Sequence, residues 1–209
     1  MKTKEAILVT ARKVLNRDGY QAVTIRHIAA EMAISHGNLG YHYPNLTAIV
    51  KALYDELVTS MDAVVGQASS GPVELEELYR QLQGVFSQFY EYRFFFLDFV
   101  AIGRNIPEIK THYAQLQLFR EQQFLEMIHR MIDKGLINNG YPEEQFIQFI
   151  RSLTVMADYW LSAASIHYGL KSPEVVNRYV NLFFSMWRPY FTPSGVAAYE
   201  KVLQNASVV

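Results

Sequence analysis

The chain has 209 residues, of which 50% are hydrophobic, with a formal net charge of −1 and no cysteine. This length allows one small module and one larger domain with a sizeable core. The lack of cysteine excludes disulfides and thiolate chemistry, and no apolar run reaches the roughly 20 residues of a membrane span. The charged start Met1–Glu5 is unlike a secretory signal, so we expect a cytoplasmic protein with no membrane segment.

The first elements that the residues themselves indicate are two short helices, expected over about 24–32 and 35–43. Each of these two begins with an N-cap residue, Thr24 or Ser35. The apolar residue before each N-cap and the one four positions after it can form a hydrophobic staple, Val23 with Ile28 and Ile34 with Leu39. Two capped helices joined by a tight turn indicate a helix-turn-helix.

The second helix of this pair offers little to a core. Only Leu39 and Tyr43 have the spacing of buried residues. Gly37 and Gly40 each cost about 1 kcal/mol of helix propensity, which a helix with an ordinary solvated surface would not sacrifice. Glycine instead lets the backbone approach another molecule closely.

The exposed side chains suit a DNA duplex. His36 and Asn38 can reach base edges, Arg26 can pair with a guanine, and hydroxyl and imidazole groups can donate to phosphates. The alternative is a helical hairpin with merely solvated polar residues. The candidate DNA-binding residues are Thr24, Arg26, Ser35, His36, Gly37, Asn38, Gly40, Tyr41 and His42.

Residues 5–56 resemble the N-terminal DNA-binding domain of the tetracycline-repressor-like (TetR) family of transcriptional regulators. The resemblance rests, in order, on a first helix over residues 5–15 that ends at Asp18-Gly19-Tyr20, then on 24–29, 34–39 and 41–43. Two positions depart from the family pattern: Gly40 replaces an aromatic residue, and Leu46 replaces a lysine that contacts phosphate. We expect a helix-turn-helix domain over 1–45 and a ligand-binding and dimerisation domain over 46–209. Its first segment, 46–66, is a connecting helix.

Charge agrees with this division. Residues 1–51 hold seven Lys and Arg against three Asp and Glu, whereas the remainder is acidic. A local excess of cations is the electrostatic footprint of phosphate binding.

Past residue 45 the pattern is helical throughout, so the fold class is all-α. Asn45 caps the connecting helix, Ser69–Pro72 forms a loop, and residues 92–103 are apolar nearly all round and expected to be buried. Further helices are expected over about 73–92, 107–134, 142–168, 172–188 and 194–205, with Gly135 as a C′ cap.

Wide aromatic stripes on the last two long helices allow two interpretations. Most such stripes are ordinary core, but these span more than one neighbour needs to cover. The resemblance implies a homodimer in which these helices pair with their twins, placing two recognition helices in major grooves about 34 Å apart. The candidate interface residues are Phe149, Leu153, Trp160, Val176, Tyr179, Val180, Phe183, Phe184 and Trp187.

The middle helices carry an excess of aromatic and thioether side chains. They either line a cavity for a small effector, as the resemblance implies, or form a packed core without one. Asp98 and Asp158 need partners, which are internal groups or a cationic effector. The candidate ligand-binding residues are Phe86, Phe89, Tyr90, Phe95, Asp98, Phe99, Phe124, Met127, Asp158 and Tyr159.

The pattern predicts no enzyme. There is no glycine-rich phosphate loop, no nucleophile elbow and no informative carboxylate pair, and the histidines lack metal-ligand spacing. We expect no cofactor and no metal. The sequence predicts a repressor that binds a palindromic operator in double-stranded DNA and is released by a small, largely apolar effector. The alternative is a helical small-molecule-binding protein with a degenerate DNA-binding head.

Overall fold

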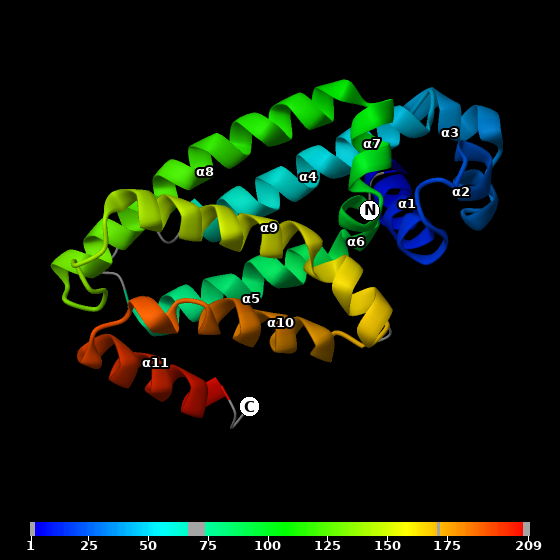
Figure 1. Cartoon of the computed structure of the whole chain (residues 1–209). Coiled ribbons are helices and arrows are strands. Elements are labelled where there is room, and N and C mark those ends of the chain that lie inside the picture. Colours follow the sequence, from blue (N-terminus) through cyan, green and yellow to red (C-terminus); the bar gives the residue numbers. More distant parts are fainter. Residues whose placement is uncertain (1–2, 67–73, 171, 207–209) are drawn as a thin grey trace. The chain divides into compact units, whose positions relative to one another are not determined.

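The computed structural model describes residues 3–66, 74–170 and 172–206, and within these ranges the chain is all-α (Figure 1). The helices are α1 Thr3–Asp18, α2 Ile25–Glu31, α3 His36–His42, α4 Leu46–Gly66, α5 Leu75–Glu91, α6 Arg93–Leu97, α7 Phe99–Asn105, α8 Pro107–Asp133, α9 Glu143–His167, α10 Glu174–Ser185 and α11 Pro193–Ala206, with a 3-10 turn η1 at Arg188–Tyr190. The predicted fold class is confirmed. The loop expected at Ser69–Pro72 lies outside the described residues.

The chain forms two compact units that are discontinuous in sequence. Unit 1 comprises Met1–Asp62 and Glu91–Tyr113, and unit 2 comprises Ala63–Tyr90 and Ala114–Val209. Unit 1 therefore adds most of α4, all of α6 and α7, and the start of α8 to the three N-terminal helices. A domain boundary directly after residue 45 remains a prediction.

The N-terminal helices α1, α2 and α3 form a compact group, which we call the head (Figure 1). Helix α1 buries one face at helical spacing, with Ile7, Ala11 and Val14 fully inaccessible to solvent. It ends at Gly19, whose φ of +81° is the left-handed conformation that favours glycine after a helix. The expected end of the first helix at Asp18-Gly19 is confirmed.

Residues 92–103 differ from expectation. They form two short helices, α6 and α7, which meet at Asp98, and Leu97 and Val100 are 39% and 55% exposed. The carboxylate of Asp98 does not cap α7 but accepts a hydrogen bond from the Tyr20 amide at 2.8 Å. Because this side chain binds another element, the apolar segment is divided at Asp98 and is not buried all round.

Unit 2 has an aromatic core. Trp160 of α9 stacks on Phe86 of α5 with ring centroids 5.3 Å apart and lies 5.1 Å from Tyr179 of α10. Phe86 also meets Phe183 edge to face at 5.4 Å. Such ring pairs add to the free energy gained by burying large apolar surfaces. The stripes on α9 and α10 therefore pack against α5 and each other within one protomer.

The C-terminal helix α11 is fastened to the loop that joins α8 to α9. The loop begins at Gly135, which has φ +73°, as expected for a C′ cap. Thr192 donates its backbone N–H to the Leu136 carbonyl at 2.9 Å and its hydroxyl to the Gly135 carbonyl at 2.6 Å.

None of the described helices is long and apolar enough to cross a membrane.

Candidate nucleic-acid interface

Local capping sets the two helices of the helix-turn-helix. The Thr24 hydroxyl accepts from the His27 amide at 3.4 Å, and His27 Nδ1 accepts from the Thr24 amide at 3.3 Å, which is a reciprocal capping box. The Ser35 hydroxyl accepts from the Asn38 amide at 3.1 Å. Both predicted N-caps are confirmed. Each hydroxyl uses a lone pair of its oxygen for the cap, which leaves its hydrogen able to donate to another acceptor.

The turn between α2 and α3 is a Schellman motif with alanine at the left-handed position. Ile34 donates to the Ala29 carbonyl at 3.0 Å, Ala33 donates to the Ala30 carbonyl at 3.0 Å, and Ala33 has φ +52°. Glycine is the usual residue at this position. Because the chain has alanine there, the sequence did not indicate a Schellman motif. The two hydrogen bonds hold the chain here despite the strain.

Replacing Ala33 with glycine should raise the free energy of unfolding by about 0.5–1 kcal/mol. The left-handed conformation costs an L-residue about 1–2 kcal/mol in the folded state, and glycine removes this cost. The larger conformational entropy of glycine in the unfolded chain cancels only part of the stabilisation. Ala30→Gly, three residues earlier within α2, should lower it by about 1 kcal/mol. Urea unfolding of both variants checks the prediction, and equal changes would contradict it.

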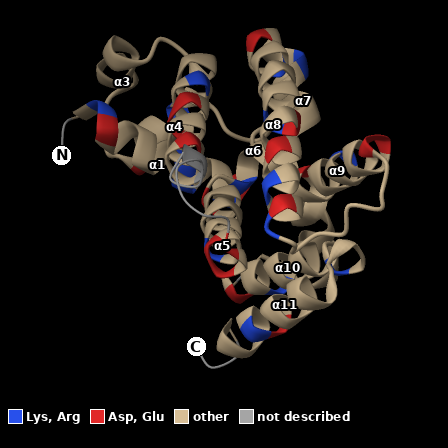
Figure 2. Ribbon diagram, turned by 90° about the vertical axis from the view of Figure 1, so that its left-hand side faces the viewer, with Lys and Arg blue, Asp and Glu red and all other residues tan. Residues whose placement is uncertain are grey.

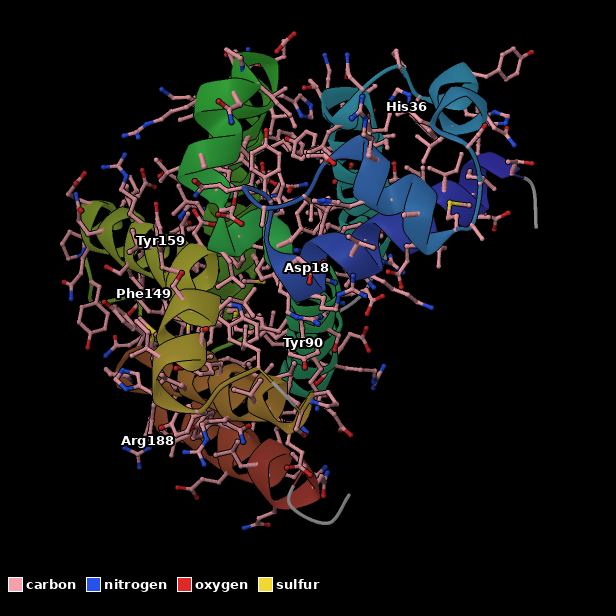
Figure 3. All side chains as sticks on the ribbon, turned by 90° about the vertical axis from the view of Figure 1, so that its right-hand side faces the viewer. Asp18, His36, Tyr90, Phe149, Tyr159 and Arg188 are labelled. Atoms are coloured by element: carbon pink, nitrogen blue, oxygen red, sulfur yellow. The ribbon has the colours of Figure 1, made fainter. Side chains whose placement is uncertain are left out.

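Helix α3 presents a neutral polar surface. Its only buried side chain is Leu39, whereas His36, Gly37 and Asn38 are exposed and Tyr41 is 86% exposed. Gly40 and His42 are half-buried. Figure 2 shows no Lys, Arg, Asp or Glu on α3, and Figure 3 shows His36 at its surface. The predicted burial of Leu39 and exposure of His36, Gly37, Asn38 and Tyr41 are confirmed. Tyr43 was expected in the core and Gly40 and His42 outside it, and all three are half-buried.

The two glycines of α3 are not required by packing within the protomer. A Cβ added at Gly40 would meet nothing within 4 Å, and one added at Gly37 would meet only the Ser35 Oγ at 4.0 Å. Alanine would fit at both positions and would favour the helix. The space beside them is therefore open to another molecule.

Several cations of α1 and α4 are already paired. Arg17 binds Asp18 at 2.9 Å and Glu31 at 3.2 Å, Arg12 binds Glu91 at 2.8 Å, and Lys51 lies 3.4 Å from Glu108. Hydrogen bonds to Asp18 and then Glu31 hold the pKa of Arg17 above its usual range. The hydrogen bond from Arg17 lowers the pKa of Asp18. The charge count from the sequence thus overstates what these side chains can offer DNA, whereas Arg26 of α2 is exposed.

Tyr43 ends α3 and lies near α4. Burial raises the pKa of its phenol, and the charge of Glu56 raises it further. The hydroxyl therefore stays protonated at neutral pH. It can donate a hydrogen bond but carries no charge that would repel a phosphate.

The candidate ligand-binding residues are divided between the two units. Phe95, Asp98 and Phe99 belong to unit 1, and the other seven belong to unit 2. Asp98 is bound by the Tyr20 amide, and Asp158 accepts from Gln117 at 3.5 Å, so both carboxylates have internal partners. Tyr159 is 47% exposed at the surface of α9 (Figure 3). In unit 2, Phe86 and Phe89 are buried, whereas Tyr90, Phe124 and Met127 are half-buried.

The candidate dimer residues belong to the core of the protomer. All nine are at most 7% exposed, so they have almost no surface left for a partner. The prediction that they form the dimer interface is wrong, because α5 and the facing sides of α9 and α10 cover both aromatic stripes within the protomer. The large apolar side chains exposed on these two helices are others, namely Val155, Tyr159, Ile166 and Leu182.

Three head helices, two of them with side-chain caps, an exposed neutral α3 and a larger helical unit define a helix-turn-helix DNA-binding protein. Comparison with known proteins gives the family. The model described as bacterial regulatory proteins of the tetR family matches residues 7–53, and the model described as bacterial transcriptional repressor, TetR, matches residues 56–199. The chain belongs to the TetR family of transcriptional regulators. Members of this family bind DNA, act as dimers and are not enzymes.

Individual relatives agree with this assignment. A TetR-family regulator from Marinobacter aquaeolei VT8 has a TM-score of 0.86 at 25% identity, with 97% of this chain and 99% of that chain covered. The regulator PfmR from Thermus thermophilus has a TM-score of 0.65 at 19% identity, over 85% and 96%. The Bacillus subtilis protein YvkB, an uncharacterized HTH-type transcriptional regulator, is 22% identical over 146 residues, or 68% of this chain and 74% of its own length.

Proposed function

We propose that the chain is a repressor that binds a palindromic operator as a homodimer and is released by a small, largely apolar effector. The observation that carries the DNA-binding half is the exposed, uncharged face of α3 with open space beside Gly40. Neutral donors and acceptors on a helix that enters the major groove read base edges, and helix N-caps and nearby hydroxyls hold phosphates. Since its partner is chromosomal DNA, the proposed location is the cytoplasm.

Selection from a pool of random duplexes tests this function and identifies the operator in the same experiment. The recovered sites should be palindromes with half-sites about one helical turn apart. Affinity should fall by about 10³–10⁵-fold between 50 and 200 mM salt if some 6–10 phosphates are contacted, because each contact releases counterions. Recovery of no common sequence, or an affinity independent of salt, would contradict the proposal.

The exposed side chains should divide into base and phosphate contacts. Arg26→Ala should cost about 1–3 kcal/mol on the selected operator and relax the preference at one base pair, because a guanidinium can pair bidentately with guanine. Tyr41→Phe, which removes one hydroxyl, should weaken operator and random duplex alike. Fluorescence anisotropy on both duplexes checks this. The assignment of Arg26 fails if its variant loses equally on both.

A second protomer is proposed to pack on the outer face of α9. Val155, Tyr159 and Ile166 are separated by four and seven residues, so they share one side of the helix, and they are 61%, 47% and 82% exposed. Leu182 of α10 adds a further apolar side chain, 51% exposed. Large apolar groups gathered on one helix face are typical of interaction surfaces. These residues replace the nine buried ones as the proposed interface.

The effector half of the proposal draws on the core of unit 2. Trp160 is 2% exposed, and its indole Nε1 is buried without a hydrogen-bond partner among the described residues. A buried N–H without an acceptor is costly. An apolar molecule that bears one carbonyl or carboxylate oxygen would supply that acceptor among the rings of Phe86 and Tyr179.

The two tryptophans of the chain allow a matched test of the effector. Trp187 is also buried with an unpartnered Nε1, so Trp160→Phe and Trp187→Phe remove equivalent donors from different places. Fatty acids, esters and ketones would be screened for release of the dimer from DNA. Trp160→Phe should weaken the response to any active compound. Trp187→Phe should preserve it and leave Trp160 as the sole tryptophan, whose fluorescence can be excited selectively over that of tyrosine. An unchanged response in Trp160→Phe would remove this residue from the proposal.

A further inference from the structure

Helix α1 and the turn that follows it bind both ends of α6 within unit 1. Asn16 donates its side-chain N–H to the carbonyl of Glu91, the last residue of α5, at 2.7 Å, and accepts from the amide of Phe94, near the start of α6, at 3.0 Å. At the other end, Asp98 Oδ2 accepts from the Tyr20 amide at 2.8 Å. One side chain thus bridges the break between α5 and α6, and another binds at the break between α6 and α7.

Neighbouring groups support both attachments. Arg12, one turn before Asn16, pairs with Glu91 at 2.8 Å and places its guanidinium 4.7 Å from the ring centroid of Tyr92. Gln21 adds a longer hydrogen bond to Asp98 Oδ1 at 3.4 Å. Gly19, with φ +81°, directs the chain so that the Tyr20 N–H meets the carboxylate. Asp98 does not cap α7, so its bond to the Tyr20 amide is not a local helix cap.

Directional bonds at both ends constrain a short helix in a way that apolar packing alone does not. Packed helices slide past one another by small shear movements, whereas a hydrogen bond weakens steeply with distance and angle. Helix α6 has five residues, and its ends are fixed to α1 and to Tyr20 just after it. Helix α1 itself packs on α2. The head therefore cannot turn against α6 without breaking bonds at Asn16 or Asp98.

We propose that Asn16 and Asp98 are positioning residues that fix the head on α6 and thereby restrict the spacing at which the dimer reads its two half-sites. This inference rests on the proposed function, because spacing has meaning only for a dimer on a palindrome. Neither side chain contacts DNA in this role. Their loss gives the head more freedom to turn, so each head still reads its own half-site while the distance between the two becomes less defined.

The test compares operators that differ only in their central spacer. Each inserted base pair moves the half-sites by about 3.4 Å and rotates them by about 35°. The wild-type dimer should lose at least about tenfold in affinity per inserted pair, and Asn16→Ala and Asp98→Ala should lose less than about threefold. Asp98→Asn keeps an oxygen for the Tyr20 N–H and should restore the wild-type preference. Asn177→Ala, on an exposed residue of α10, is the control substitution.

Two further readouts separate the outcomes. Affinity for a duplex with a single half-site should be the same in wild type and variants, and amide exchange should accelerate at Tyr20 in Asp98→Ala and at Phe94 in Asn16→Ala. If the wild type binds no palindrome, the proposed function fails, and exchange rates still report on the attachments. If the wild type discriminates spacers and both alanine variants retain that discrimination, the positioning role is overturned. If Asp98→Ala does not fold, the result for Asn16→Ala decides whether the positioning role holds. Asn16 is half-buried, so the Glu91 carbonyl and Phe94 amide that its loss leaves unpaired can bind water.

Discussion

Placing glutamate at both Tyr159 and Ile166 is expected to separate the dimer and to lower operator affinity by about 10²–10⁴-fold. A two-fold axis brings the same patch of each protomer together, so every introduced charge meets its own copy in an apolar interface. The exposed fractions of 47% and 82% mean that the protomer itself loses little packing. A monomer has only one α3 to place in the DNA. In the dimer, binding of one head holds the second head at a high effective concentration near its half-site, and the monomer lacks this contribution to affinity.

Sedimentation and anisotropy check this prediction together. The double variant should sediment as a monomer at micromolar concentration, with an unchanged melting temperature at concentrations where the wild type also dissociates. Its affinity for a single half-site should equal that of the wild type. Val100→Glu, which charges an apolar side chain of α7 that is 55% exposed, should remain a dimer. A double variant that still dimerises would exclude the outer face of α9 as the interface.

The elements that the sequence predicted well are those set by neighbours in the chain. Thr24 and Ser35 cap helices through bonds that reach only three residues ahead, and Gly135 ends α8 because its own φ is positive. Such signals act before any tertiary contact forms. The exposed α3 was predicted for the same reason, since a single buried residue, Leu39, defines its inner face.

The dimer surface could not be read from the sequence because periodicity identifies an apolar face but not the neighbour that covers it. Trp160 and Phe183 pack against Phe86 of α5, which lies far away in sequence. Tyr159, only one position from Trp160, points to another side of the helix and is partly exposed. A helical step of about 100° separates a core residue from a surface residue.

Asp98 shows a second kind of limit. Its partner is the backbone amide of Tyr20, 78 positions earlier, and every residue except proline carries such an amide. Side-chain chemistry therefore gives no sign of the pairing. The carboxylate was expected to find an internal group, and it did, but only the fold could identify which one. The same holds for Ala33, whose left-handed turn is set by hydrogen bonds and not by a glycine.

Gly195 lies where α11 presses on the loop between α8 and α9. It is buried, and a Cβ built there would lie well inside contact distance of the Leu136 carbonyl oxygen and 3.0 Å from the Cβ of Phe191. The obstacle is backbone, and Thr192 holds that same carbonyl by a hydrogen bond at 2.9 Å. Neither side can yield without breaking the attachment of α11.

Gly195→Ala should therefore lower the free energy of unfolding by at least about 2–3 kcal/mol, which is the upper part of the range for overpacked sites. In a chain of this size the melting temperature should fall by roughly 5–10 °C.

Gly40→Ala makes the same change in a helix where nothing lies within 4 Å of the added Cβ, and it should raise the free energy of unfolding by up to about 1 kcal/mol. On DNA the two should reverse: the Gly40 variant should bind the operator more weakly, because its methyl group occupies the space proposed for the duplex, and the Gly195 variant should bind normally below its melting temperature. Calorimetry and anisotropy on the two variants measure both effects. Equal destabilisation would refute the clash at Gly195, and unchanged operator affinity in Gly40→Ala would mean that the backbone of α3 does not approach the DNA there.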